Sequence, residues 1–218
     1  MKVKIMNTVI KIEPIEVKGR LEELGLKEEL LNNSILKGLI ARSESTLNHP
    51  PLYAGFITWA NIVKGLREEL IPLGWVRNDE NMYSRIFNPT GTIAIAVATG
   101  DENTGNPHIN SMTKSSKGNA TNKAVTINAQ LSLNFGFENI EIEDSENNKI
   151  KTWLLMFSIN NNEVLSELSL PISFNGKVNG WNERIILGSI PLDPTSTDIP
   201  LSPLPQLPDI DVLISRRA

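Results

Sequence analysis

A polar stretch between residues 99 and 123 holds most of the side chains whose types could perform chemistry. Asp101 and Glu102 follow an apolar run, and carboxylates of this kind suit a hard cation such as Mg²⁺. His108, in the same stretch, could act as a general base. Asp101, Glu102 and His108 are therefore the candidate catalytic residues of a metal-dependent hydrolase or nuclease acting on a phosphate ester or nucleic acid.

Three lysines lie further along the same stretch, among small residues. Small residues let backbone N–H groups approach an anion closely, and lysines add positive charge. Lys114, Lys117 and Gly118 are thus candidate phosphate-binding residues, although the GxxxxGK[ST] spacing of a P-loop is missing. The alternative interpretation is a surface loop that binds no ligand.

Composition excludes several kinds of site. The chain has no cysteine, which excludes disulfides, thiolate nucleophiles and Cys-ligated zinc. Its two histidines exclude a His-rich metal site, and no GxSxG motif is present. Glu141 and Glu143 could converge on one strand face, with a solvated hairpin as the alternative. No compact catalytic constellation appears, so the catalytic and metal-binding residues stay unassigned and no cofactor is expected, Mg²⁺ applying only to the hydrolase alternative.

Trp181 is the candidate partner-binding residue. It stands in a polar segment, after Asn179-Gly180 and before Asn182. A tryptophan exposed in a turn can anchor a partner or stack on a base. Packing against the core is the alternative for this side chain.

The polar stretch must be positioned by the apolar run at residues 92–98. This run is apolar on both faces, which is typical of a central strand covered on both sides. Residues 88–91 form a strong turn signal, because Pro89 and Gly91 suit two of its positions. We therefore predict an antiparallel hairpin of residues 82–87 and 92–98 that delivers the polar loop to one edge of the sheet.

The clearest helix spans about residues 55–71. Its apolar residues follow the helical i, i+3, i+4, i+7 spacing, and Pro72 ends it. A loose strand ended by Pro14 precedes two short helices over 21–31 and 35–40, with breaks at Gly25 and near residues 32–34. These elements form the helical N-terminal segment, residues 1–45.

The second half of the chain predicts further strands. Residues 125–137 alternate between apolar and polar, which favours a strand, with a helix from about Thr121 as the alternative. Four more strands are predicted at residues 138–142, 150–159, 163–171 and 184–190. The Asn175-Gly176 turn and the other short connections indicate an antiparallel meander. The fold class is thus α+β, with a mainly antiparallel sheet of about six strands and one amphipathic helix packed on it.

We predict a single α+β domain over residues 1–190, followed by a proline-rich C-terminal arm over 191–218. Within the domain, residues 1–45 precede a helix-plus-sheet unit over 54–190. Six of the thirteen prolines fall between residues 191 and 208, which favours extended geometry. The arm is expected to lie over its own domain or to dock on a partner.

Charge and hydropathy bear on the possible partners and on the location of the protein. With a net charge of −4, the chain lacks the overall positive surface charge that is typical of a nucleic-acid-binding protein. No signal peptide or membrane span is expected, which indicates a soluble, cytoplasmic protein. We expect a non-enzymatic binding or assembly module that contacts a protein partner or a second copy of itself through the 99–123 loop and the arm. Nucleic acid is a further partner class, and the metal-dependent hydrolase is the alternative function.

Overall fold

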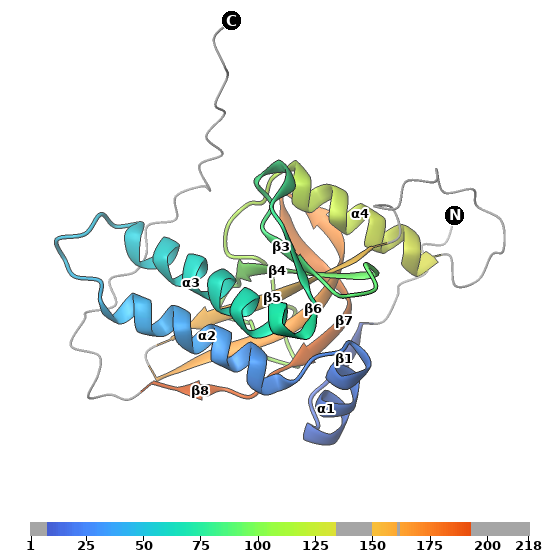
Figure 1. Ribbon diagram of the computed structural model, residues 1–218, viewed down its shortest axis with the longest axis horizontal. Helices are drawn as coiled ribbons and strands as arrows, with labels where there is room; N and C mark the ends of the chain where they lie inside the picture. The colour runs from blue at the N-terminus through green and yellow to red at the C-terminus, as the bar shows by residue number, and fades with distance from the viewer. Residues whose placement is uncertain (1–7, 134–149, 161, 193–218) are drawn as a thin grey trace, which may run out of the picture.

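The computed structural model describes residues 8–133, 150–160 and 162–192, and its centre is a mixed β-sheet (Figure 1). The strand order is β1-β7-β6-β5-β4-β3-β2, and β8 pairs with the start of β6. The strands are β1 (Val9–Lys11), β2 (Val76–Asn78), β3 (Arg85–Phe87), β4 (Ile93–Thr99), β5 (Lys151–Ile159), β6 (Glu163–Asn175), β7 (Lys177–Ile186) and β8 (Ile190–Pro191).

Helices cover both faces of this sheet. Helices α1 (Pro14–Glu23), α2 (Glu28–Ser43) and α3 (Tyr53–Leu70) pack on one face, where Ile95 and Val97 of β4 point. Helix α4 (Asn119–Leu133) packs on the other face, where Val125 contacts the cluster that contains Ala96 and Ala98. Strand β4 is therefore central and buried on both sides, as the sequence predicted.

The prediction of a mainly antiparallel sheet is wrong in one respect. Strand β4 pairs with β5 in parallel, from Ile93–Lys151 to Thr99–Phe157, and β1 pairs with β7 in parallel. Parallel neighbours need a long crossover connection, and α4 lies within that connection between β4 and β5. The number of helices also differs from the prediction. The described residues contain four α-helices, whereas one amphipathic helix and a helical N-terminal segment were expected.

The predicted strand at residues 125–137 is wrong over residues 125–133, and residues 134–137 lie outside the described residues. Residues 119–133 are helical, and the strongly buried positions follow a helical i, i+3, i+4, i+7 spacing. These positions are Thr121, Ala124, Val125 and Asn128. The segment carries both an alternating and a helical pattern of apolar residues, and the helix from about Thr121, the alternative in the sequence analysis, is the one that forms.

Several local predictions are confirmed. The helix predicted at 55–71 is α3, and its Trp59 indole donates to the Val97 carbonyl at 3.0 Å. Strands β3 and β4 form the predicted hairpin, β5 and β6 correspond to the predicted strands at 150–159 and 163–171, and Gly176 makes the β6–β7 turn with a positive φ of 70°.

Other local predictions fail or lie outside the described residues. The break at Gly25 is confirmed, but α2 runs unbroken through residues 32–34, and Pro14 begins α1 instead of only ending a strand. Phe56, an apolar residue that the helical spacing placed in the stripe of this helix, lies off the buried stripe of α3, with 62% of its surface exposed. The predicted strand at 138–142 and the arm beyond residue 192 fall outside the described residues. No helix in the described ranges is long and apolar enough to cross a membrane.

Candidate functional site

The loop between β4 and α4 is fastened to the sheet along its length. Gly100 and Thr113 form a β-bridge, and the Lys114 amide donates to the Thr99 carbonyl at 2.9 Å. Thr113 also exchanges two hydrogen bonds with Val178 of β7, each 3.1 Å long. The loop is therefore packed against β7 and does not extend freely into solvent.

A buried ion pair beneath the loop holds its middle part in place. Glu167 of β6 and Arg184 of β7 are 0% and 2% exposed, and their side chains meet at 2.5 Å. Glu167 also accepts hydrogen bonds from the Gly105 amide at 2.9 Å and from the Ser111 hydroxyl at 2.7 Å. A carboxylate with several charge-assisted donors is strongly stabilised although it is buried.

Arg184, the cation of the pair, also binds the loop. Its guanidinium donates to the carbonyls of Ile109 at 2.9 Å and Asn106 at 3.1 Å. Three backbone polar groups of the loop, at Gly105, Asn106 and Ile109, are thus satisfied by buried charges from two strands. The ion pair thus holds residues 105–111 in place through hydrogen bonds from both of its members.

Sequence reasoning did not assign this role to Glu167 and Arg184. The available signal was that one predicted strand contains the acidic residue Glu167 and the next predicted strand contains the basic residue Arg184. Register places Ser169 opposite Arg184, so Glu167 and Arg184 are diagonal neighbours on one face. The sequence could not show that these two residues bind the loop, because the loop lies about 60 residues earlier in the chain.

Trp181 is a correction to the sequence analysis. Its side chain is 1% exposed and packs in the cluster between the sheet and α4. Its indole N–H donates to the Ser111 carbonyl at 2.9 Å. A ring buried in this way cannot anchor a partner, and it acts instead as a second attachment point for the loop.

The candidate catalytic residues do not form a common site. Asp101 is half-buried and accepts from the Asn103 amide at 3.2 Å, as a turn-forming aspartate does. Glu102 and His108 are exposed. Over residues 8–133, 150–160 and 162–192, no group of three or more His, Asp or Glu side chains could hold a metal ion.

The candidate phosphate-binding residues lie on the surface beside the β6–β7 turn. Lys114 and Gly118 are exposed, and Lys117 is partly buried. The Lys117 amide donates to the Gly176 carbonyl at 2.8 Å, and its ammonium group contacts the Ser115 hydroxyl at 3.4 Å. The structure thus brings the lysines of the loop close to Lys177 in the neighbouring hairpin.

Two segments that lie side by side here contain no carboxylate. Residues 103–133 and 168–182 have neither Asp nor Glu, in a chain with 25 acidic residues. They are joined by the bonds at Thr113 and Lys117 and by the Asn110 amide, which donates to the Asn179 carbonyl at 2.8 Å. We call their exposed part the lysine surface; it carries Lys114, Lys117, Lys123 and Lys177.

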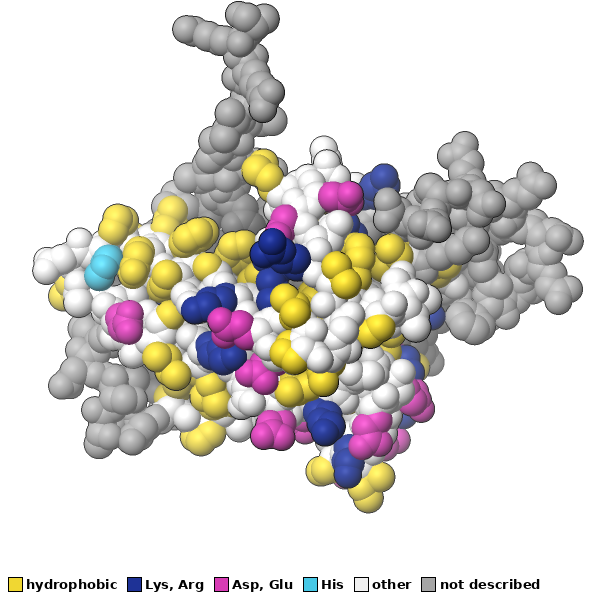
Figure 2. All heavy atoms as spheres, in the orientation of Figure 1, with side chains coloured by type: hydrophobic (Ala, Val, Ile, Leu, Met, Phe, Trp, Pro, Cys, Tyr) yellow, Lys and Arg dark blue, Asp and Glu magenta, His cyan; other side chains and the backbone are white. Residues whose placement is uncertain are grey.

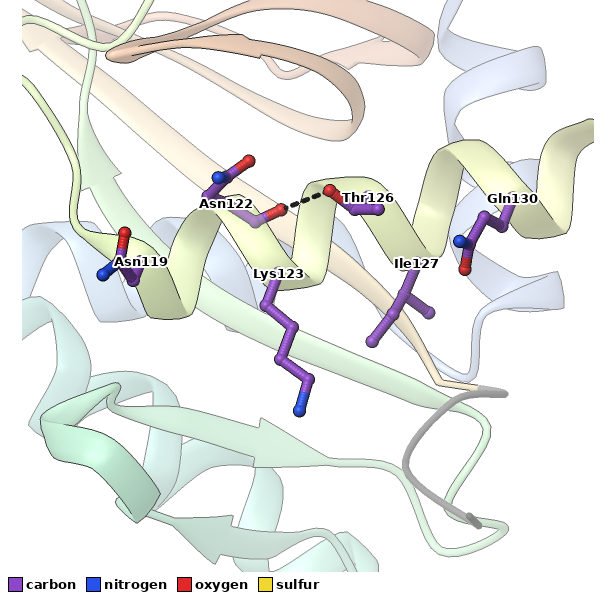
Figure 3. Close-up of a pocket in the computed structure, with 6 residues that line it drawn as sticks. All are labelled: Asn119, Asn122, Lys123, Thr126, Ile127 and Gln130. Atoms are coloured by element: carbon purple, nitrogen blue, oxygen red, sulfur yellow. Dashed lines mark hydrogen bonds between the residues drawn. The ribbon is translucent and has the colours of Figure 1, made fainter. Parts of the chain in front are cut away.

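The exposed side of α4 forms the rest of the lysine surface. A shallow hollow of about 440 Å³ runs along the helix, and Lys123 and Ile127 point to the same side of it (Figure 3). The side chains that line it are Asn119, Asn122, Lys123, Thr126, Ile127 and Gln130. These are amides, a hydroxyl, an ammonium group and one apolar contact, a set suited to binding rather than to acid–base catalysis.

The opposite side of the sheet has a different charge pattern. On the face that carries α2 and α3, Lys and Arg side chains are interspersed with Asp and Glu (Figure 2). Lys37 lies between Glu68 at 3.1 Å and Glu69 at 2.8 Å. In the described part of the chain, by contrast, Lys114, Lys123 and Lys177 form no ion pair.

Comparisons of the chain with protein-family models, curated proteins and solved structures found no match. The function is therefore argued from the geometry of the lysine surface and its supporting ion pair. The arrangement offers a backbone held by hydrogen bonds, cationic side chains and a row of amide groups. Among the described residues, it shows no paired acid and base positioned for a reaction.

Proposed function

We propose that the protein is a non-enzymatic binding module that contacts a macromolecular partner through the loop at residues 99–123 and the adjoining side of α4. The observation that carries this proposal is the Glu167–Arg184 pair, which fixes the loop at residues 105–111. A surface that is ordered before binding loses less conformational entropy when the partner arrives. The C-terminal arm is a second proposed contact, and it begins at β8.

The hydrolase or nuclease alternative is not carried further. Asp101 has a turn-forming role, and Glu102 and His108 are exposed without a shared ligand geometry. A metal-assisted reaction needs ligands that converge on one point. The described residues supply no observation that favours this function over binding.

Site-specific photo-crosslinking tests the proposal. A benzophenone amino acid is placed at Met112 or Asn122, both exposed on the proposed surface, in cells that naturally make the protein. The control position is Ile15 of α1, which is 88% exposed and lies outside that surface. We expect crosslinked adducts from Met112 and Asn122 that Ile15 does not give.

The proposal is wrong if the three positions give the same adducts or none. Circular dichroism of each purified variant verifies that the fold is retained. Because the probe reacts with proteins and nucleic acids alike, the result does not depend on the class of partner. Gel shifts that resist nuclease treatment identify a protein adduct.

A further inference from the structure

We infer that residues 201–210 of the C-terminal arm bind the outer side of α3 in their own chain. Thr58 and Gly65 of this helix lie against Gly38 and Ser34 of α2. On the side that faces away from α2, five apolar residues follow one another at helical spacing. We call them the apolar strip of α3: Leu52, Phe56, Ala60, Val63 and Ile71.

The apolar strip of α3 is accessible to solvent. Leu52, Phe56 and Ile71 are each at least 40% exposed, and Figure 2 shows hydrophobic side chains along this edge of the helix. A hollow of about 540 Å³ lies beside the strip, and the residues that line it include Ala60, Val63, Ile71, Pro72 and, from β2, Arg77. An exposed apolar surface beside a hollow is typical of a site that another chain segment covers.

The arm carries a matching apolar pattern. Leu201, Leu204, Leu207 and Ile210 recur at every third residue, in a segment with prolines at 200, 203, 205 and 208. A polyproline helix has three residues per turn, so these four side chains fall on one of its edges. Segments of this kind dock on surfaces with aromatic rings, and Phe56 provides one, 6.0 Å from the ring of Trp59.

The strip and the apolar edge of the arm have the same length. An α-helix rises about 28 Å over the 19 steps from Leu52 to Ile71. A polyproline helix also rises about 28 Å over the nine steps from Leu201 to Ile210. One straight segment of the arm can therefore cover the whole strip.

The arm leaves the sheet at the end where α3 begins. The Leu192 amide donates to the Asn162 carbonyl at 2.8 Å, just after β5 ends, and Trp59 of α3 donates to Val97 near the end of β4. Because β4 and β5 are parallel, both contacts lie at the same edge of the sheet. β8 is separated from β4 by β6 and β5, which corresponds to about 14 Å. The nine residues from Leu192 to Leu201 can span about 30 Å.

This short connection favours the strip of the same chain over that of a second copy. A short flexible linker gives its two ends an effective concentration in the millimolar range, far above an ordinary concentration of free chains. An arm that enters at Leu52 reaches Ile71 with Ile210, which brings Asp209 and Asp211 towards Arg77. Within the described residues, Arg77 forms no ion pair.

Alkylation of single cysteines tests the inference on the full chain, which has no cysteine of its own. One variant at a time is made on the apolar edge of the arm, Leu204→Cys or Leu207→Cys, or on its other edges, Ser202→Cys or Gln206→Cys. The rate of reaction with a maleimide is measured and divided by the rate of the same variant in urea. This ratio removes differences in intrinsic reactivity and leaves the protection that docking provides.

We expect Leu204→Cys and Leu207→Cys to react about tenfold more slowly than Ser202→Cys and Gln206→Cys, because only their thiols face α3. Adding Phe56→Glu and Ile71→Glu should remove this difference to within about twofold, because docking would bury two unpaired carboxylates. The control pair, Ile12→Glu and Ile15→Glu, adds the same charge at exposed positions at the start of α1 and should keep the difference. The protection should not change between about 1 and 100 μM chain.

Four results would overturn the inference. They are equal rates at the four arm positions, protection that survives Phe56→Glu with Ile71→Glu, an equal loss of protection with the control pair, and protection that grows with chain concentration. The last result would make a second copy the occupant of the strip. Circular dichroism of each variant verifies that the fold is retained.

The inference does not rest on the loop, and the two tests are independent. If the arm is protected while Met112 and Asn122 give no specific adducts, the binding module is wrong and the docked arm stands. The converse result removes the docked arm alone. A docked arm still presents its other two edges, with Ser202, Gln206 and Asp209, to the partner of the proposed function.

Discussion

Glu167 and Arg184 show how two residues can determine the shape of a distant loop. Their side chains are almost fully buried, and they satisfy backbone groups of Gly105, Asn106 and Ile109. Burying two charges is unfavourable unless their hydrogen bonds are complete. The loop supplies the missing partners, so its position and the stability of the ion pair depend on each other.

Removing one charge of this pair is expected to destabilise the protein strongly. In Glu167→Gln the guanidinium of Arg184 remains buried without its counter-charge, which should lower the free energy of unfolding by about 3–5 kcal/mol. Urea denaturation followed by circular dichroism measures this change. Proteolysis of the folded variant should also cut the loop near residues 105–111, because its anchor is weakened.

The matched control is Glu163→Gln, in the same strand but at its partly exposed start. We expect it to change stability by less than about 0.5 kcal/mol. If the two substitutions change the free energy of unfolding equally, Glu167 does not stabilise the loop in the way argued here.

Tyr83 provides a test by pH. Burial of its hydroxyl raises the pKa of Tyr83 to about 12, from an ordinary value of 10.0. The unfolded chain therefore loses this proton at lower pH than the folded protein does. The corresponding stability is complete below pH 10 and is lost as the pH rises towards 12, by about 3 kcal/mol in total.

Ultraviolet titration of phenolate absorbance, together with urea denaturation at pH 9 to 12, measures this effect. Tyr83→Phe should remove the high-pKa phenol and reduce the loss of stability above pH 10. Tyr53→Phe, on α3, is the comparison for the other tyrosine of the chain. If Tyr53→Phe removes the high-pKa titration instead, the raised pKa belongs to Tyr53 and the prediction for Tyr83 is wrong.

At the scale of elements, α2 and α3 pack closely because a glycine lies between them. A Cβ added at Gly38 would be 2.4 Å from the Cγ1 atom of Ile62 and 2.8 Å from the Thr58 carbonyl oxygen. Real Cβ atoms do not approach other atoms so closely. The close approach of the two helices therefore depends on the absence of a side chain at residue 38.

Two glycine substitutions test this packing. Gly38→Ala should destabilise the protein by about 1–3 kcal/mol, because α2 and α3 must separate. Gly19→Ala, in the open part of α1, should stabilise it by about 0.5–1 kcal/mol, because alanine is the better helix former. Thermal denaturation of both variants gives the signs, and a neutral or stabilising Gly38→Ala would contradict the packing argument.

At the scale of the whole molecule, the sheet carries a layer of helices on one face and α4 with its loop on the other. Both layers pack on the same central strands, such as β4 and β5, through the side chains on opposite faces of those strands. A molecule whose two layers rest on the same strands is expected to unfold in one step. The lysine surface and the mixed-charge face then belong to a single cooperative unit.

Native-state hydrogen exchange in increasing urea tests this expectation. Amides in the interiors of α2 and α4, on opposite faces, should converge on the same free energy of global unfolding. A lower plateau for α4 and the loop alone would show that this layer opens independently. That outcome would contradict a single cooperative domain over the described residues.

The sequence by itself determined the elements whose signals are local. The helical period of α3, the apolar run of β4 and the turn at Gly176 lie within a few neighbouring residues, and the structure confirms all three. Residues 119–133 carried both an alternating and a helical pattern. Only the requirement to cross between the parallel strands β4 and β5 decided for the helix.

Tertiary structure alone decided the candidate site. Trp181 and Ser111 are 70 residues apart in the chain, and Gly105 and Glu167 are 62 apart. No local period encodes such pairs, because they depend on which strands become neighbours and on which face each side chain then points. The lysines were visible in the sequence, but the two segments that carry them adjoin only because folding brings residues 103–133 against 168–182.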